Sequence, residues 1–299
     1  MNLRGVVVPM VTPVTGTGAL DEPAAARLIE FLIAGGVDGI FVLGTTGEGA
    51  MVPPAARQRL VELTVAQARR RALIYVGIGD APVEGAAVSN AFLRAGADVI
   101  VARPPVTHPV EQLLPWYRAL LDQLEGPLII YNMPMMSKVS VPLDVIGSLL
   151  GHPKLVGIKD SENNAFRLEE LLRRFGNRPD FAVFVGVGAL MEEGLKLGAV
   201  GIVPSVGNLI PEVCRNLCVS AGRGDWVAAN DHFSRMNTVA ALYQKGRTLS
   251  ESLSVLKAAV SCRGLCAPHV LPPLRPVTET ELAALRSQMS RLQLLNGKP

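Results

Sequence analysis

The feature that most constrains the fold is an alternation of short apolar runs and longer stretches with helical periodicity, repeated from residue 5 to residue 220. In the first such stretch, residues 21–35, apolar side chains recur at i, i+3, i+4 and i+7, beginning at Ala25. The expected strands are residues 5–10, 39–43, 73–78, 98–102, 128–131, 155–159, 181–185 and 200–203. The expected helices are residues 21–35, 54–71, 83–95, 110–124, 142–149, 165–175, 190–197 and 210–220.

These strands are apolar along their whole length, which is typical of parallel strands covered on both faces. Helices between parallel strands make right-handed βαβ crossovers. Eight such units predict an α/β fold, the closed (β/α)8 or TIM barrel. A doubly wound open sheet is the alternative, but the turn after the first strand, MVTPVTG, lacks the G-x-G-x-x-G fingerprint. Gly186-Val187-Gly188, after the seventh strand, is a lone G-x-G that a tight turn also explains.

Beyond the eighth unit the sequence has helical patterns but no strand-like run. These patterns cover residues 226–244, 249–262 and 278–294. Four prolines between residues 264 and 276 predict an extended connector. We therefore expect a barrel domain over residues 1–223 and a C-terminal helical extension over residues 224–299, which packs on the barrel or on a partner subunit.

Composition limits the classes of protein that this chain can be. Hydrophobic residues make up 49% of the 299 residues and charged residues 18%, which excludes a disordered chain. The formal net charge is +3, and the tight basic run at residues 69–71 closes an expected helix. We interpret that run as a solvated helix end rather than a phosphate-binding patch, and we predict no nucleic-acid partner. Because Pro9 and Pro13 interrupt the apolar start, we expect no signal peptide or membrane span and a cytoplasmic protein.

The cysteines form two pairs at a spacing of one helical turn, Cys214 with Cys218 and Cys262 with Cys266. Zinc sites more often use C-x2-C or C-x4-C spacing with histidines near by, and His269 alone is close to either pair. We interpret the cysteines as small buried side chains, kept reduced in a cytosolic protein, and predict no metal site.

Active sites of such barrels lie at the carboxyl ends of the strands, so reactive side chains there are the first candidates. Lys159 ends the apolar run LVGIK, which places its side chain in the barrel mouth. Burial disfavours the ammonium form and makes the neutral amine available as a nucleophile. One interpretation is therefore a Schiff base with a carbonyl substrate. The other is a strand-end lysine paired with Asp160 in water, and position alone does not decide between them.

Other strand ends carry groups that could act with this lysine. Tyr131 ends the fifth strand, and its phenol could move protons, although a packed tyrosine with a hydrogen-bonded hydroxyl fits equally well. Thr45 and Thr46 lie in the turn GTTGE, whose hydroxyls and backbone N–H groups could hold a carboxylate, although GTTG is also simply a favourable turn. The remaining strand ends offer Thr12, Arg103 and Ser205.

Four motifs occur in order along the chain: PMVTPV near the start, GTTGE at 44–48, YNMP at 131–134 and GIKDS at 157–161. Together they resemble the dihydrodipicolinate synthase and N-acetylneuraminate lyase family of class I aldolases. The resemblance covers nearly the whole chain, including GAVGIVPSVGNLIPE at 198–212 and the C-terminal helices. It implies a carbon–carbon lyase in which Lys159 attacks C2 of pyruvate, or of another 2-oxo acid, and forms an imine.

The resemblance also implies roles for other residues. Tyr131 would move protons through Thr45, and the protonated imine would be the electron sink that lets the C3–C4 bond break or form. The partners would be pyruvate and an aldehyde, with no cofactor and no metal. Members of this family are commonly homotetramers, and a homodimer is the alternative. The substrate-binding positions it implies are Thr45, Thr46, Gly186, Val203 and Met136.

Departures from the family pattern limit which substrates we expect. Dihydrodipicolinate synthases carry an arginine two residues after the YNxP proline, which binds the carboxylate of the aldehyde. This chain has Met136 there, and Lys138, two residues further on, is a point charge that makes no bidentate contact. The synthases also borrow a tyrosine from the adjacent subunit, at a position where this chain has Val106 within Pro104–Thr107.

Two turns favour a catabolic aldolase. Sialic acid lyases place acidic residues after the seventh strand, whereas residues 186–189 hold none, as in 4-hydroxy-2-oxoglutarate aldolases. GIKDS, with Asp160, is closer to those aldolases and to 2-keto-3-deoxy acid aldolases than to the GIKEA of synthases. We therefore expect reversible cleavage of a 4-hydroxy-2-oxo acid or 2-keto-3-deoxy acid to pyruvate and an aldehyde. The alternatives are 4-hydroxy-tetrahydrodipicolinate (dihydrodipicolinate) synthase and a non-catalytic barrel that binds a 2-oxo acid.

Overall fold

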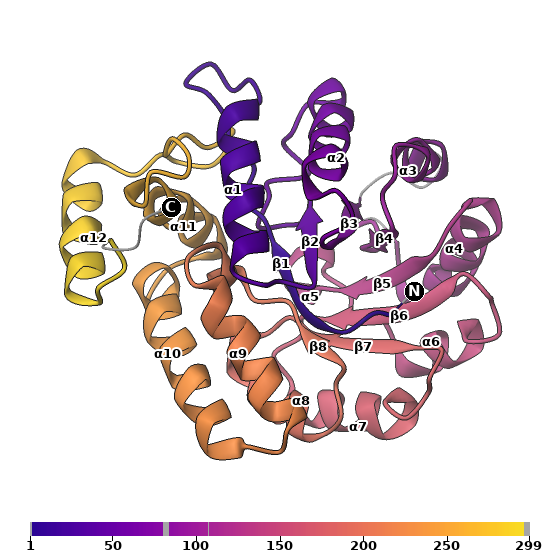
Figure 1. The fold of residues 1–299 in the computed structure, drawn as a ribbon. Helices are drawn as coiled ribbons and strands as arrows, with labels where there is room; N and C mark the ends of the chain where they lie inside the picture. The colour runs from indigo at the N-terminus through magenta and orange to yellow at the C-terminus, as the bar shows by residue number, and fades with distance from the viewer. Residues whose placement is uncertain (1, 80–83, 107, 296–299) are drawn as a thin grey trace.

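A computed structural model describes residues 2–79, 84–106 and 108–295. Eight parallel strands form one closed barrel, in which each strand pairs with the next and β8 pairs with β1 (Figure 1). This confirms the predicted (β/α)8 barrel over the open sheet. The strands are β1 (Gly5–Pro9), β2 (Gly39–Val42), β3 (Leu73–Ile78), β4 (Val99–Ala102), β5 (Leu128–Asn132), β6 (Leu155–Asp160), β7 (Ala182–Val185) and β8 (Gly201–Ile202).

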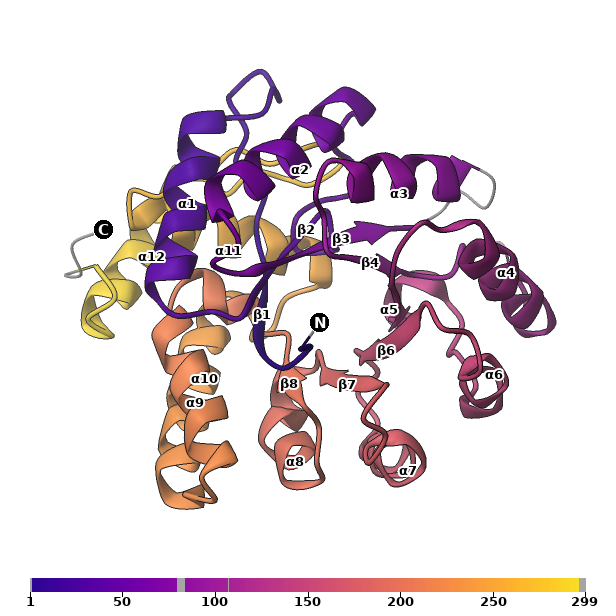
Figure 2. The same ribbon diagram turned by 45° about the vertical axis from the view of Figure 1, so that its right-hand side comes forward.

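Helices surround the barrel on its outside (Figure 2). Those that follow the strands are α1 (Glu22–Ala34), α2 (Pro54–Ala68), α3 (Glu84–Arg94), α4 (Val110–Gln123), α5 (Pro134–Ser137), α6 (Leu143–Leu149), α7 (Ala165–Phe175), α8 (Met191–Lys196) and α9 (Pro211–Gly222). Two short 3-10 turns are η1 (Gly188–Leu190) and η2 (Ser205–Asn208). The C-terminal helices are α10 (Trp226–Gln244), α11 (Leu249–Cys262) and α12 (Glu279–Arg291).

All expected strands and helices are present, with ends that differ by a few residues. α2 stops at Ala68 because Arg69 and Arg70 adopt positive φ angles of 48° and 61°, so the basic run follows the helix instead of closing it. Arg71 turns back to Glu30, 2.5 Å away, and both side chains are exposed. The run is thus part of a solvated surface. The sequence pattern did not predict α5, η1 or η2, and Val83, the expected start of α3, lies outside the described residues.

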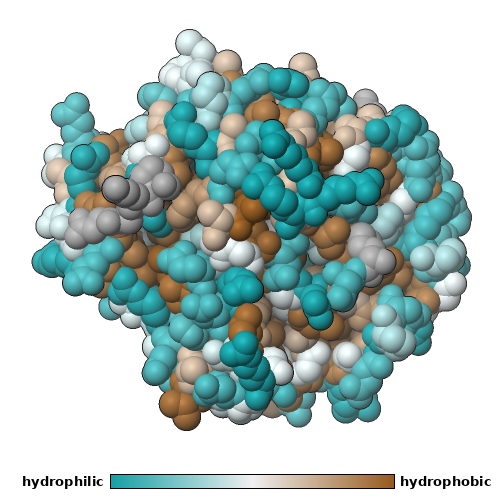
Figure 3. Space-filling view, viewed as in Figure 1, coloured by the Kyte–Doolittle hydropathy of each residue, from teal (hydrophilic) through white to brown (hydrophobic). Residues whose placement is uncertain are grey.

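Each strand buries both of its faces. Side chains on the inner face form one apolar cluster that fills the barrel, and those on the outer face pack against the helices in a second, larger cluster. This double burial is the reason why the strand sequences are apolar at every position. Hydrophilic side chains cover much of the outer surface (Figure 3). The inner cluster comprises Val7, Phe41, Tyr75, Val99, Val101, Ile129, Tyr131, Ala182, Phe184 and Val203.

The three C-terminal helices continue the ring of helices at one side of the barrel (Figure 1). α10 packs on α9, α11 packs on α10, and α12 packs on both α10 and α11. The starts of α11 and α12 are each fixed by a capping box, Thr248 with Glu251 and Thr278 with Glu281. The helices therefore begin at positions that the sequence itself specifies.

The cysteines are free thiols, and burial raises the pKa of Cys218 and of Cys266 to about 12, so both stay protonated. Cys214 and Cys266 are buried, as expected, whereas Cys218 and Cys262 are half-buried. Within the described residues, no three or more His, Cys, Asp or Glu side chains gather as a metal site would require. In the same part of the chain, no helix has the length and hydropathy of a membrane span.

Candidate active site

The amine of Lys159 lies inside the mouth of the barrel, against two aromatic rings. In the sheet register Lys159 of β6 is directly opposite Tyr131 of β5. Its Nζ lies 3.9 Å from the centroid of the Tyr131 ring and 5.0 Å from that of Phe41. The residue is 7% exposed. Lys159 is thus a buried amine, and burial is one way in which proteins activate a lysine as a nucleophile.

Asp160 does not pair with this lysine. Successive side chains of a strand point to opposite faces, so Asp160 faces the outer layer of helices. Its Oδ2 accepts hydrogen bonds from Arg167 Nε of α7 at 2.9 Å and from Asn132 Nδ2 at 3.0 Å. The interpretation of Lys159 and Asp160 as a solvated strand-end pair is therefore wrong. Asp160 instead ties the ends of β5 and β6 to α7, and sequence spacing did not reveal Arg167 as its partner.

Tyr131 connects the lysine to the GTTGE turn. Its hydroxyl lies 3.3 Å from Thr45 Oγ1, within hydrogen-bond distance. Burial, the largest effect, raises the pKa of Tyr131, but the charge of Lys159 and hydrogen bonds with Thr45 and Lys159 outweigh it, and the pKa ends below its usual value. A phenol tuned in this way gives up and regains a proton more readily at neutral pH.

The GTTGE turn is held in place by its own backbone and by the segment that follows β1. Gly47 N–H donates to Gly44 O at 3.1 Å, and the Thr12 hydroxyl donates to Gly47 O at 2.6 Å. A Cβ on Gly47 would lie 2.8 Å from the carbonyl oxygen of Met10, so the turn requires glycine there. Thr45 and Thr46 are both half-buried at this rigid turn.

The last residue of the motif, Glu48, is bound by the C-terminal extension. Lys257 of α11 is fully buried and forms an ion pair with Glu48 Oε1. Glu48 Oε2 accepts a hydrogen bond from Leu271 N at 2.7 Å. Burial lowers the pKa of Lys257, and Glu48 opposes that effect. The sequence analysis missed Lys257, although a lone lysine in the otherwise apolar LSVLKAAV was a usable signal.

Gly186 and Val203, two of the expected substrate-binding positions, lie near the lysine. A Cβ on Gly186 would meet Ser161 Oγ at 2.1 Å and Lys159 Cε at 3.0 Å, so a glycine is needed for the lysine to fit. Val203 is buried and lines the same small internal space as Lys159. Both residues therefore shape the surroundings of the amine.

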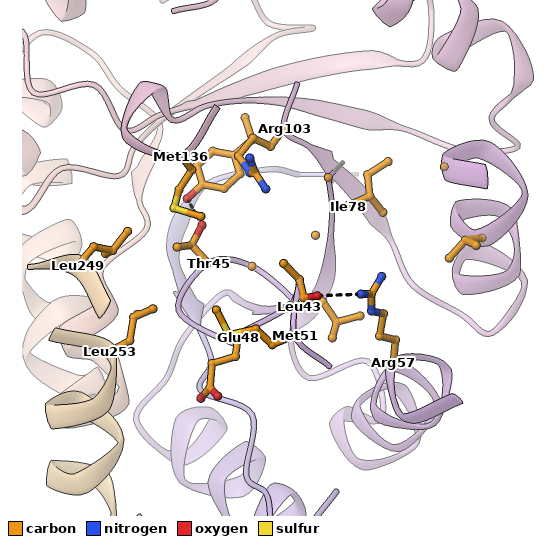
Figure 4. A pocket seen from close by; sticks show the side chains of 18 of the residues that line it. Leu43, Thr45, Glu48, Met51, Arg57, Ile78, Arg103, Met136, Leu249 and Leu253 are labelled. Carbon is orange, nitrogen blue, oxygen red and sulfur yellow. Dashed lines mark hydrogen bonds between the residues drawn. The ribbon is translucent and has the colours of Figure 1, made fainter. Parts of the chain in front are cut away.

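A cavity opens at the barrel mouth. Its lining includes Thr45, Tyr131 and Met136, but not Lys159, whose amine is reached past the Tyr131 ring. Figure 4 shows Arg103, Met136 and Thr45 around one end of the cavity, and Leu249 and Leu253 of α11 at its side.

Lys138, two residues after Met136, does not line this cavity. It is exposed, and its Nζ donates to the carbonyl of Met135 at 3.1 Å. Val106 is 50% exposed at the end of the loop after β4, and Thr107 beside it lies outside the described residues. Within the chain as described, neither position supplies a polar group to the cavity.

Comparison with known proteins agrees with this geometry. A sequence model of the Dihydrodipicolinate synthetase family matches residues 2–292. The chain belongs to that family. It is 32% identical over 299 residues to a 4-hydroxy-tetrahydrodipicolinate synthase of Anaeromyxobacter sp., covering 98% of each chain. It is 29% identical over 296 residues to the putative 2-dehydro-3-deoxy-D-gluconate aldolase YagE of Escherichia coli, covering 97% of each.

Solved structures give the same result. The dihydrodipicolinate synthase of Bacteroides thetaiotaomicron superposes with a TM-score of 0.92 at 32% identity, covering 97% of this chain and 100% of that one. YagE of E. coli, solved in complex with pyruvate, superposes with a TM-score of 0.90 at 28% identity, covering 97% and 99%. The chain is thus a carbon–carbon lyase of the class I pyruvate aldolase family, as its motifs implied.

Proposed function

We propose that Lys159 forms a Schiff base with C2 of a 2-oxo acid, and that the enzyme reversibly cleaves a 4-hydroxy-2-oxo acid or 2-keto-3-deoxy acid to pyruvate and an aldehyde. The observation that carries this proposal is the position of the Lys159 amine, buried against Tyr131, whose hydroxyl is within hydrogen-bond distance of Thr45. An amine, an acid–base group and a turn for the carboxylate then lie at one barrel mouth.

The steps balance without a further reactant. The amine adds to the C2 carbonyl, and loss of water gives the protonated imine. Removal of the proton from the 4-hydroxyl group lets the C3–C4 bond break, which releases the aldehyde and leaves the electron pair in the enamine. Protonation at C3 and hydrolysis return pyruvate and the free amine. Tyr131 would carry these protons with Thr45, while Thr45 and Thr46 hold the C1 carboxylate.

Met136 supports the preference for an aldolase over a synthase. A thioether cannot make the bidentate contact that an arginine makes with a carboxylate, and Met136 lines the cavity where the acceptor enters. The relatives include named synthases, N-acetylneuraminate lyases and the aldolase-like YagE at similar identity, so they leave this choice to the pocket.

A cytoplasmic homotetramer or homodimer is part of the same proposal. Val106, in the loop between β4 and α4, and Val110, the first residue of α4, are 50% and 41% exposed, and a partner subunit would cover them. Light scattering after size-exclusion chromatography measures the assembly, and a monomer at all concentrations would contradict it.

Borohydride trapping tests the proposed nucleophile. We expect pyruvate plus borohydride to give a covalent adduct that peptide mass spectrometry places on Lys159. Lys159→Ala should lose both the adduct and aldolase activity, whereas the exposed Lys196→Ala should keep both. An absent adduct, or one on another lysine, would refute the Schiff base and leave the non-catalytic binding barrel as the better account.

A panel of aldehydes offered with pyruvate tests the reaction. We expect condensation with simple or hydroxylated aldehydes, or with short aldehyde acids, and slow turnover with aspartate semialdehyde. Rapid formation of the dihydrodipicolinate product would instead favour the synthase.

A further inference from the structure

A buried cation at the barrel mouth has no role in the chemistry proposed so far. Arg103 directly follows β4, and its backbone N–H donates to Ile78 O of β3 at 3.0 Å. Val101, two residues earlier, belongs to the inner barrel cluster, so alternation along the strand directs Arg103 inward as well. The residue is 7% exposed and lines the same cavity as Tyr131. Arginine is rarely buried to this extent without an ionic function.

The neighbouring strand leaves room for the guanidinium. A Cβ on Gly79 would lie 3.0 Å from Arg103 Nη2, so the side chain extends across a glycine. The positive charge also reaches the reacting groups. Burial has the largest effect on the pKa of Tyr131 and raises it, but the charges of Lys159 and Arg103 both lower it. Arg103 is therefore an electrostatic neighbour of the proton-carrying group.

Tyr131 and Lys159 lie on the adjacent strands β5 and β6, and Arg103 directly follows β4, the strand on the other side of β5. Tyr131 pairs with Lys159 in the register, and Ala102 pairs with Ile130, which places Arg103 level with Tyr131. Because adjacent strands lie about 4.8 Å apart, the backbones of β4 and β6 are roughly 10 Å apart at this level. A five-carbon substrate bound at C2 to Lys159 could thus extend across Tyr131 toward Arg103.

We propose that Arg103 is a specificity residue that binds a carboxylate on the acceptor aldehyde, so that the preferred substrate is a 4-hydroxy-2-oxo diacid. This inference rests on the Schiff base proposed for Lys159. It assigns the acceptor as a short aldehyde acid, and it places the acceptor-binding cation just after β4 rather than on α5, which carries Met136.

The chemistry of arginine suits this role. A guanidinium has five N–H donors in one plane, so it can bind both oxygens of a carboxylate while it also contacts the groups around it. The other candidate cations are less suitable. Arg57 lines the cavity at its opposite side (Figure 4), and its Nε donates to Val52 O at 2.7 Å. Lys138 is exposed and lies outside the cavity lining.

Two substrates that differ at one carbon test the proposal. 4-Hydroxy-2-oxoglutarate and 4,5-dihydroxy-2-oxopentanoate share their first four carbons, and C5 is a carboxylate in the first and a hydroxymethyl group in the second. We expect the wild-type enzyme to cleave the diacid with the higher kcat/KM. Equal or reversed preference would overturn the proposal.

Variants at Arg103 then locate the preference. A lost contact to a charged group corresponds to about a 10- to 100-fold fall in kcat/KM, so Arg103→Met should lose that much on the diacid and less than about threefold on the hydroxymethyl substrate. Arg103→Lys, which keeps the charge but not the bidentate contact, should be intermediate and also serves if Arg103→Met does not fold. Arg57→Met is the matched control and should keep the preference.

Borohydride trapping with pyruvate separates the two levels of the proposal. If wild type and Arg103→Met both form the Lys159 adduct, but Arg103→Met loses activity equally on the two substrates, the role of Arg103 is wrong and the Schiff base stands. If the wild type forms no adduct, the proposed function itself fails.

Discussion

At the scale of single residues, the site depends on one tyrosine that two opposing effects tune. Burial raises the pKa of Tyr131, and the charge of Lys159 with the hydrogen bond from Thr45 lowers it further than burial raises it. The hydroxyl can therefore donate a proton at neutral pH and recover it easily. The same contacts hold the ring against the lysine amine.

This tuning predicts a shifted pH profile. If the neutral phenol is the active form, activity falls as pH rises through the pKa of Tyr131, so the alkaline limb of kcat/KM should lie below pH 10. Thr45→Val removes a hydrogen bond that favours the phenolate, which raises the pKa and should move the limb to higher pH. Thr46→Val, one residue away, should change KM but leave the limb in place.

Tyr131→Phe completes this test. We expect kcat to fall by about 10²- to 10⁴-fold, while pyruvate still forms the trapped adduct with Lys159. An alkaline limb that stays unchanged in both Tyr131→Phe and Thr45→Val would assign it to another group.

At the scale of elements, the GTTGE turn depends on a helix more than 200 residues later in the chain. Lys257 of α11 and Leu271 N both bind the carboxylate of Glu48, which is fully enclosed. Since Glu48 closes the turn that carries Thr45 and Thr46, the C-terminal extension helps to fix the site.

Removing one member of this buried pair should be costly. Lys257→Met leaves the Glu48 carboxylate buried without its cation, and we expect a loss of about 3–5 kcal/mol in the free energy of unfolding, measured by urea denaturation. The double variant Glu48→Gln/Lys257→Met should recover part of that loss. Lys196→Met, which breaks the exposed pair with Glu192, should cost less than about 1 kcal/mol. A similar small loss for Lys257→Met would show that the pair contributes little.

At the scale of the whole molecule, this contact predicts that the barrel and the C-terminal extension unfold together. The chain has two tryptophans, Trp116 on α4 of the barrel and Trp226 on α10 of the extension. In a variant with one tryptophan replaced by phenylalanine, the fluorescence of the remaining tryptophan reports on the unfolding of the part that contains it. At a fixed protein concentration, we expect the fluorescence of both variants and their circular dichroism to give the same urea midpoint. Coincident transitions are what one cooperative unit requires. Separate midpoints would mean that the extension unfolds independently.

Much of this could be predicted from local sequence, because it is encoded over short distances. Strands buried on both faces must be apolar throughout, so the eight runs with helices between them predicted a covered parallel sheet, with the closed barrel favoured over an open one. The caps Thr248 and Thr278 likewise mark where α11 and α12 begin. Lys159 and Tyr131 were candidates because they end strands, and strand ends converge at one mouth.

The tertiary structure decided which side chains meet. Asp160 follows Lys159 directly, yet the alternation of the strand sends it to Arg167 on the outside of the barrel, while Lys159 packs on Tyr131 within. Lys257 reaches Glu48 because the C-terminal helices pack against the barrel, and Arg103 extends over Gly79 because β3 and β4 pair side by side. Sequence alone thus determined the elements and the reactive residue types, whose signals are local and periodic. The partners of each charge depend on where the closed barrel places it, and no local pattern records that.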